Sequence, residues 1–181
     1  SQLETEFNNM IESVKRYGGF YIGRYETGNL SQEKASIIKN NSDIGNQTWY
    51  TMYKKAKGIA VNNNVTSSMI WGSQWDATMR WMYNSGNEEK KKYTYDSRGK
   101  GNYSSDSPIA TGSIEAYAVN NIYDMAGNVS DWTIEAYSTV LRVTRGGNYS
   151  DDGSNGPASV RRSSNPTNSI DNYGFRVALY M

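Results

Sequence analysis

The stretch RGGNYSDDGSNGPASVRRSSNPTNSIDNYGFRVAL, residues 145–179, is rich in side chains that form hydrogen bonds. Of the 26 residues from Asn148 to Tyr173, 16 are Asn, Ser, Asp or Tyr. Asn, Ser and Asp supply adaptable hydrogen bonds, and Tyr supplies a rigid contact area at low entropic cost. This combination suits a surface that binds another molecule.

The same composition has a second explanation, which stays open at this point. Turn-rich segments favour Asn, Asp and Ser for backbone reasons alone. Asn, Ser, Asp and Tyr together also make up 50 of the other 155 residues. An invariant polar loop is therefore the alternative to a binding surface.

Other kinds of site are excluded by composition. The chain contains no cysteine and no histidine, which removes thiol nucleophiles, disulfides, the usual zinc sites and imidazole acid–base catalysis. With 19 basic and 18 acidic residues, the net charge is +1, so no basic surface for nucleic acid is indicated. No apolar run approaches the length of a membrane span. We therefore expect neither a nucleic-acid partner nor membrane insertion.

The elements that must position this segment begin with helices. Apolar residues at helical spacing predict a helix that ends at Gly18; they are Phe7, Met10, Ile11 and Val14. A second helix is expected from its N-cap Thr48 to Gly58. A third is expected after Ser73 as N-cap, with Trp75, Met79 and Met82 on one face.

Strands and long loops are expected in the rest of the chain. Residues 19–28 and 140–147 alternate like strands, and so does GFRVAL near the C-terminus. Residues 84–113 are polar and glycine-rich and predict a long irregular insertion, with the charged run Glu88–Lys92 as a solvated loop. At 181 residues the chain suits one α+β domain, residues 1–181, either alone or as the C-terminal domain of a longer protein.

Four motifs in this order carry a resemblance to a known family: YGGFYIGRYETG, MIWGSQWDATMRWM, NIYDMAGNVSDWT and RVTRGGNYS…GFRVAL. Together they resemble the formylglycine-generating-enzyme (sulfatase-modifying factor) family over nearly the whole chain. The resemblance implies a C-type-lectin-like fold, with about three helices, short strands and much irregular loop.

The resemblance also limits the activity. The oxidase branch of the family binds copper with two cysteines after the Arg-Gly-Gly motif, the first near Asp151, and this chain has no cysteine. A second branch forms C–S bonds with iron held by histidines, which are also missing. The remaining branch is non-catalytic and includes the variable proteins of diversity-generating retroelements, often carried by phages and prophages of gut bacteria. We therefore expect no enzyme activity.

In that branch, copying of an RNA template changes adenines at random, so Asn codons become codons for Asp, Tyr or Ser. The resemblance thus implies a diversified surface between Arg145 and Tyr173 that binds a protein or cell-surface target, and a location on the virion or bacterial surface. The implied ligand-binding residues are Asn148, Tyr149, Ser150, Asp151, Asp152, Ser154, Asn155, Asn165, Asn168, Ser169, Ile170, Asp171, Asn172 and Tyr173.

Some members of this segment have a structural alternative. Tyr149 and Tyr173 are equally compatible with core positions, and the arginines Arg145, Arg162 and Arg176 are expected to hold loops together. We expect six residues to be exposed on one face: Ser150, Asp151, Asp152, Asn168, Asp171 and Asn172. Four are expected to be buried: Gly146, Gly147, Phe175 and Val177.

A second candidate site lies in NIYDMAGNVSDWT. The family resemblance implies a structural Ca²⁺ ion held by the carboxylates of Asp124 and Asp131 and the carbonyls of Gly127 and Val129. The alternative is that Asp124 and Asp131 accept hydrogen bonds from backbone N–H groups of the turn. No cofactor is otherwise required by the sequence.

Overall fold

The computed structural model describes residues 1–59, 62 and 64–181 and has the mixed α+β architecture that the sequence predicts. Its helices are α1 (Gln2–Tyr17), α2 (Trp49–Ala56), α3 (Gly72–Asn84), α4 (Glu88–Tyr95) and the 3₁₀ turn η1 (Glu115–Tyr117). Its strands are β1 (Tyr21–Ile22), β2 (Thr66–Met69), β3 (Ala118–Val119), β4 (Ile122–Tyr123), β5 (Ser130–Ala136), β6 (Arg142–Arg145), β7 (Arg161–Ser164), β8 (Tyr173–Phe175) and β9 (Val177–Tyr180).

The first two helices have the ends that the sequence predicts. Ser1 and Glu4 form a capping box at the start of α1, and Gly18 ends it in the left-handed conformation with a φ of 83°. Thr48 caps α2 by accepting a hydrogen bond from the Thr51 amide. Both ends are therefore encoded by local residue chemistry.

The later helices differ from the prediction at two points. Ser73 is not the N-cap of α3, because Trp71 takes that position and its amide donates to the Gln74 side chain. Helix α4 lies inside the predicted irregular insertion, so the interpretation of Glu88–Lys92 as a loop is wrong. Asn87 caps α4. The only large side chain that this helix buries is Tyr93, and for this reason residues 88–95 show little amphipathic pattern.

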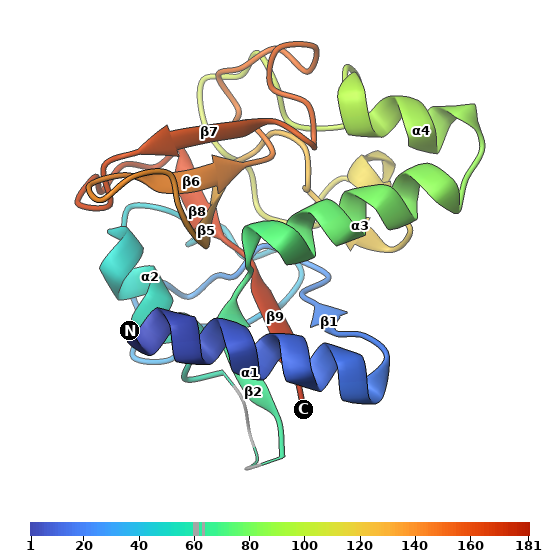
Figure 1. The fold of residues 1–181 in the computed structure, drawn as a ribbon. Helices are drawn as coiled ribbons and strands as arrows, with labels where there is room; N and C mark the ends of the chain where they lie inside the picture. Colours follow the sequence, from blue (N-terminus) through green and yellow to red (C-terminus); the bar gives the residue numbers. More distant parts are fainter. Residues whose placement is uncertain (60–61, 63) are drawn as a thin grey trace.

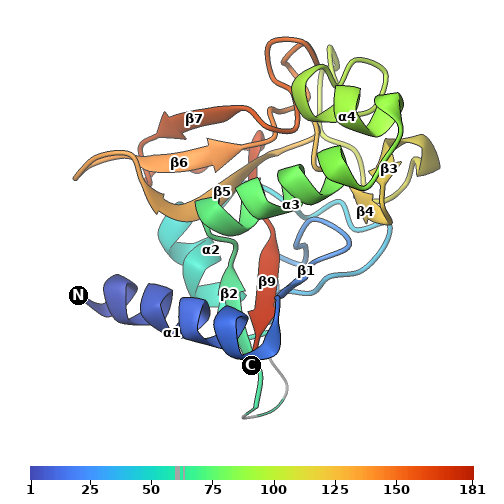
Figure 2. The same cartoon turned by 45° about the vertical axis from the view of Figure 1, so that its right-hand side comes forward.

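The strands form two sheets and one hairpin. The order is β1-β9-β2 in one sheet and β7-β6-β5-β8 in the other, and β3 pairs with β4. The predicted strand over residues 19–28 is reduced to β1, and GFRVAL is split between the two sheets at Arg176. Both chain ends lie on the opposite side of the molecule from β7 (Figures 1 and 2).

Two buried clusters hold these layers together. One surrounds Trp132 and Phe175, and α1 joins it through an edge contact between Phe7 and Trp71, whose rings are 5.1 Å apart. The other lies under α3 around Trp75 and Met125. Phe175 and Val177 are fully buried as predicted. Among the described residues, no helix is both long and apolar enough to cross a bilayer.

The break at Arg176 places a guanidinium in the centre of the core, with 0% of the residue exposed. Its Nη1 donates to the Gly23 carbonyl and its Nη2 to the Tyr123 carbonyl, each at 2.8 Å. Its Nε faces the Asp131 carboxylate at 3.4 Å. One side chain therefore joins the segment after β1, strand β4 and strand β5.

Candidate ligand-binding surface

The polar segment 148–172 connects β6 to β8 and contains β7, one of the two edge strands of the four-stranded sheet. In Figure 1 the loop before β7 rises at the top of the molecule, beside α4, and the loop after β7 turns back at the left. β7 pairs with β6 in antiparallel register from Arg142–Ser164 to Arg145–Arg161. The sheet thus fixes the middle of the segment, and two loops extend from its ends.

The segment begins at a pair of glycines that the backbone requires. Gly146 and Gly147 both have positive φ values, 87° and 69°. A Cβ on Gly147 would lie 2.4 Å from the Gly156 carbonyl oxygen, and one on Gly146 would lie 2.8 Å from the Met125 oxygen. Both glycines are buried as predicted. They let the first loop fold back on itself directly after β6.

Asn148 is not exposed, so its prediction as a ligand-binding residue is wrong. Only 7% of it is accessible. Its Oδ1 accepts hydrogen bonds from the amide and hydroxyl of Ser150, and its own amide donates to Asp151. Its Nδ2 points at the Ser130 hydroxyl, 3.4 Å away. Asn148 therefore satisfies the polar groups of a tight turn that has no regular ladder.

Asp151 also has a structural role, and its expected exposure is not found, because it is half-buried. Both of its carboxylate oxygens accept from Nη1 of Arg162 at 2.7 Å. Nη2 of the same arginine donates to the Asn155 carbonyl at 3.1 Å. This ion pair ties the first loop to β7, which confirms the prediction that Arg162 holds loops together.

Arg145 and Arg176 act in the same way. The Arg145 guanidinium is buried and forms an ion pair with Asp76 on α3. Burial lowers the pKa of Arg145, and the Asp76 carboxylate opposes that effect. Arg145, Arg162 and Arg176 therefore all bind protein groups, as the sequence predicts.

Most of the remaining implied binding residues are exposed. Exposed positions are Ser150, Asp152, Ser154, Asn155, Asn165, Asn168, Ser169 and Ile170. Several of their side chains bond only within their own turn: Asp152 accepts from the Ser154 amide, and Asn165 accepts from the Thr167 amide. The Asn155 side chain has no hydrogen-bond partner among the described residues. These side chains are available for contact with another molecule.

The two loops meet at one hydrogen bond. The Tyr149 hydroxyl donates to Asp171 at 3.0 Å, and both residues are half-buried. Burial and this carboxylate raise the pKa of Tyr149. The contact brings residues 148–155 and 165–172 into one surface region, although Asp171 and Asn172 are less exposed than predicted. The Tyr173 ring packs against Trp132, with ring centroids 4.7 Å apart. Tyr173 therefore packs against the core and does not belong to the exposed surface.

Loops that are far away in the sequence support this region, and no sequence pattern predicted them. Ser104 and Ser105 donate backbone hydrogen bonds to the carbonyls of Asp151 and Tyr149. On the other side, the Asn46 amide bonds the Ile170 carbonyl, and Ser169 bonds the Asn46 carbonyl. Thr167 and Arg161 are exposed within the region and were not predicted, because neither belongs to the Asn/Ser/Asp/Tyr pattern.

The second candidate site, in the turn between β4 and β5, is deeply buried. Asp124 is 2% exposed and Asp131 is 1% exposed. Oδ2 of Asp124 accepts hydrogen bonds from the Thr111 hydroxyl and the Gly112 amide. Asp131 faces Arg176 through one oxygen, and its other oxygen has no partner among the described residues. Asp124 is thus hydrogen-bonded, as in the alternative, but its donors come from residues 111–112 and not from its own turn.

Glu26 is a third buried acid of this cluster, and sequence reasoning missed it. It is 0% exposed and accepts from the Asn128 side chain at 2.6 Å and from the Val129 amide at 3.3 Å. Burial, then the charges of Asp124 and Asp131, raise the pKa of Glu26 well above its usual value. Burial likewise raises the pKa of Asp131 to about 6, against the opposing effect of Arg176.

The four residues implied for calcium do not fit that ion as they are arranged. The guanidinium of Arg176 occupies the approach to Asp131 and would repel a cation. Oδ2 of Asp124 is already committed to hydrogen bonds from Thr111 and Gly112. Within the described part of the chain, no group of three or more acidic, Cys or His side chains could hold a metal. The polar groups of the turn are instead bonded to other parts of the chain, namely Thr111, Glu26 and Arg176.

Known proteins share this architecture. The model of the sulfatase-modifying factor enzyme 1-like domain matches residues 60–181. No curated protein has a matching sequence.

Among solved structures, Treponema denticola variable protein 1 is 16% identical, with 76% of this chain and 70% of that chain covered and a TM-score of 0.54. PvdO from Pseudomonas aeruginosa is 16% identical, with 90% and 80% covered and a TM-score of 0.57. The U1 variant of the major tropism determinant is 14% identical, with 90% and 50% covered and a TM-score of 0.55. At these identities the likeness concerns the fold, and it confirms the predicted C-type-lectin-like class.

The contrast between Asn148 and Asn155 gives a matched test of the surface. Replacing Asn148 by Ala leaves the amide and the hydroxyl of Ser150 without the side-chain oxygen that accepts from them, so the free energy of unfolding should fall by about 1–3 kcal/mol. Asn155→Ala removes an exposed side chain without a partner and should change it by less than about 0.5 kcal/mol. Urea denaturation measures both. Equal effects of the two substitutions would contradict the division of the segment into structural and free side chains.

The buried acids predict a pH dependence of stability. Because the folded-state pKa of Asp131 lies near 6, above its unfolded value, its contribution is fully present below about pH 4 and is lost as the pH rises through about 6. The raised pKa of Glu26 acts in the same direction. Asp131→Asn should therefore flatten the fall in unfolding free energy between about pH 4 and 6.

Asp152→Asn is the control for this pH dependence. The Ser154 hydroxyl and amide lower the pKa of this exposed acid, so its contribution is present above the unfolded pKa and is lost only as the pH falls through its lower folded value. The slope above pH 4 should be unchanged in Asp152→Asn. An unchanged slope in Asp131→Asn would show that the buried carboxyl does not titrate in this range.

Proposed function

Since the chain belongs to the sulfatase-modifying factor enzyme 1-like family, we propose that it is a non-catalytic, ligand-binding member, the variable protein of a diversity-generating retroelement. Its diversified surface is the segment between Arg145 and Tyr173. The ligand is a protein or another molecule on a cell surface. The protein acts on a virion or a bacterial cell surface, in a phage or prophage of a gut bacterium.

Two of the similar structures support this proposal by what they are called. One is a variable protein and another is a major tropism determinant. The third, PvdO, leaves other uses of the same fold open. Fold likeness alone does not establish function, so the properties of the polar segment must support the proposed role.

The observation that carries the proposal is the separation of roles within the polar segment. Asn148, Asp151 and Arg162 hold the backbone, while the side chains of Ser154, Asn155 and Ile170 are exposed and form no hydrogen bond with a distant element among the described residues. Such side chains can change without disturbing the core, which is the property that a diversified surface needs. An invariant binding module, the alternative, has no reason for this separation.

The neighbouring DNA provides the test of diversification. We expect a reverse transcriptase gene and a near-copy of the segment encoding residues 145–179 beside this gene. Across isolates, differences should be confined to positions that are adenines in the copy and should concentrate on the exposed residues. A locus without the copy, with an identical segment in all isolates, would support the invariant module and contradict the proposal.

The missing cysteines predict the absence of oxidase activity. With copper, oxygen and a peptide carrying the cysteine motif of a sulfatase, the protein should leave the peptide mass unchanged, because Asp151 cannot replace a thiolate as a copper(I) ligand. A formylglycine-generating enzyme with its cysteine pair serves as the positive control. Appearance of the aldehyde with this protein would overturn the non-catalytic assignment.

A further inference from the structure

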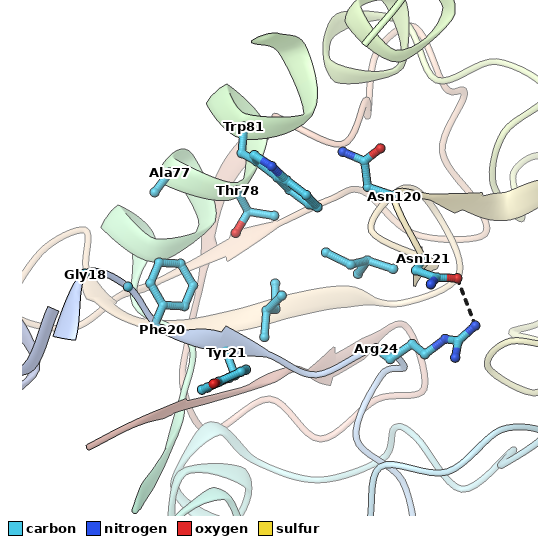
Figure 3. Close-up of a pocket in the computed structure, with 12 residues that line it drawn as sticks. Gly18, Phe20, Tyr21, Arg24, Ala77, Thr78, Trp81, Asn120 and Asn121 are labelled. Atoms are coloured by element: carbon cyan, nitrogen blue, oxygen red, sulfur yellow. Dashed lines mark hydrogen bonds between the residues drawn. The ribbon is translucent and has the colours of Figure 1, made fainter. Parts of the chain in front are cut away.

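A hollow of about 600 Å³ lies away from the polar segment, between α3, β1 and the turn that joins β3 to β4. Its apolar walls are Phe20, Ile22, Ile122 and Trp81. Figure 3 shows the Trp81 indole reaching down from α3 over this floor, with Arg24 and Asn121 at the far end. In Figure 2, α3 lies between β1 and strands β6 and β7, so the hollow is separate from the proposed display surface.

Trp81 is a large aromatic residue that the fold leaves only partly buried. Close to half of this residue, 49%, is accessible. Its indole N–H has no hydrogen-bond partner among the described residues, and unlike the unpaired indole N–H groups of Trp71 and Trp132 it belongs to an exposed residue. A wide ring beside an apolar hollow, with a free donor on its edge, is suited to cover a bound group.

Arg24 is held in place at the other end. Its Nη2 donates to the Asn121 side chain at 2.9 Å, and its guanidinium lies 5.6 Å from the centre of the Tyr123 ring and 5.7 Å from that of Tyr25. These contacts leave other N–H groups of an exposed guanidinium unpaired. A positioned arginine loses little entropy on binding and matches the two oxygens of a carboxylate.

The charge around the hollow has one sign. Arg24 is the only ionisable cation or acid among the residues that line it. Farther out, Glu115 pairs with Lys39 at 3.7 Å and accepts a hydrogen bond from the Tyr123 hydroxyl. The region therefore contains one acid, Glu115, and two cations, Arg24 and Lys39. The hollow therefore favours an anion at its Arg24 end and an apolar body along Phe20, Ile22 and Trp81.

We propose that this hollow is a second binding site, specific for a small organic carboxylate with an aromatic or branched apolar body. The carboxylate pairs with Arg24, and the apolar body lies under Trp81. This site does not depend on the diversification of residues 145–173, so it stands or falls separately from the proposed function.

The test compares two probes of one shape, 4-phenylbutyrate and its neutral amide. In ¹H–¹⁵N spectra the indole N–H of Trp81, assigned with Trp81→Phe, should shift in a saturable manner with the acid. The acid should bind about tenfold more tightly than the amide, since a charge-assisted hydrogen bond to Arg24 is lost in the amide. Equal affinities, or no saturable shift at Trp81, would overturn the proposal.

Variants locate the effect. Arg24→Gln should bring the two affinities together, and Trp81→Ala, at a half-exposed position, should weaken both probes. Arg80→Gln is the matched control, because Arg80 is an exposed arginine of α3 outside the hollow, and it should keep the preference for the acid. Loss of that preference in Arg80→Gln would show a general charge effect and contradict the site.

Sedimentation of the wild-type protein tests whether a second copy of the chain, and not a carboxylate, occupies the hollow. A dimer that Trp81→Ala converts to a monomer would make the hollow an interface between two copies, and the carboxylate site would then be wrong. An oligomeric state that Trp81→Ala leaves unchanged is the result that the proposal requires.

Discussion

The buried guanidinium of Arg176 is the interaction on which the rest of the structure depends. A fold with short strands has few regular ladders, so its carbonyls need other donors. Arg176 supplies three of them with bonds, at Gly23, Tyr123 and Asp124, and faces the carboxyl of Asp131. It stands between β8 and β9, where the chain passes from one sheet to the other. Replacing Arg176 by a neutral residue would leave the buried carbonyls and the Asp131 carboxyl without their partner. We therefore expect this position to be intolerant of substitution.

A core fixed in this way frees the surface that follows β6. The turn of residues 146–151 is held by its own glycines, by Asn148 and by the Asp151–Arg162 pair. Further along, the backbone is bonded to loops near residues 46 and 104. Because these contacts use mostly main-chain groups and a few fixed side chains, the other side chains carry little of the stability.

The sequence predicted what local chemistry determines and missed what distant contacts determine. Gly18 and Thr48 each predict a helix end from the residue type alone, and Gly146-Gly147 predict a sharp turn. By contrast, α4 packs mainly through Tyr93 and has little periodicity, so composition suggested a loop. Asn148 and Asn155 are the same residue type, three and ten positions after Arg145 at the end of β6, and only the fold shows that one is buried and the other exposed. Glu26 was invisible because its partners, Asn128 and Val129, lie about a hundred residues away.

The central claim is that one polar segment contains two classes of side chain, those that hold the backbone and those that are displayed. The most direct measurement is a scan of every single substitution from Asn148 to Asn172, with folding read as protease resistance of the protein displayed on cells. The account predicts loss of resistance at Asn148 and Asp151 and broad tolerance at Ser154, Asn155, Asn168 and Ile170. Intolerance at the second set, equal to that at the first, would show that the whole segment is structural and would contradict the account.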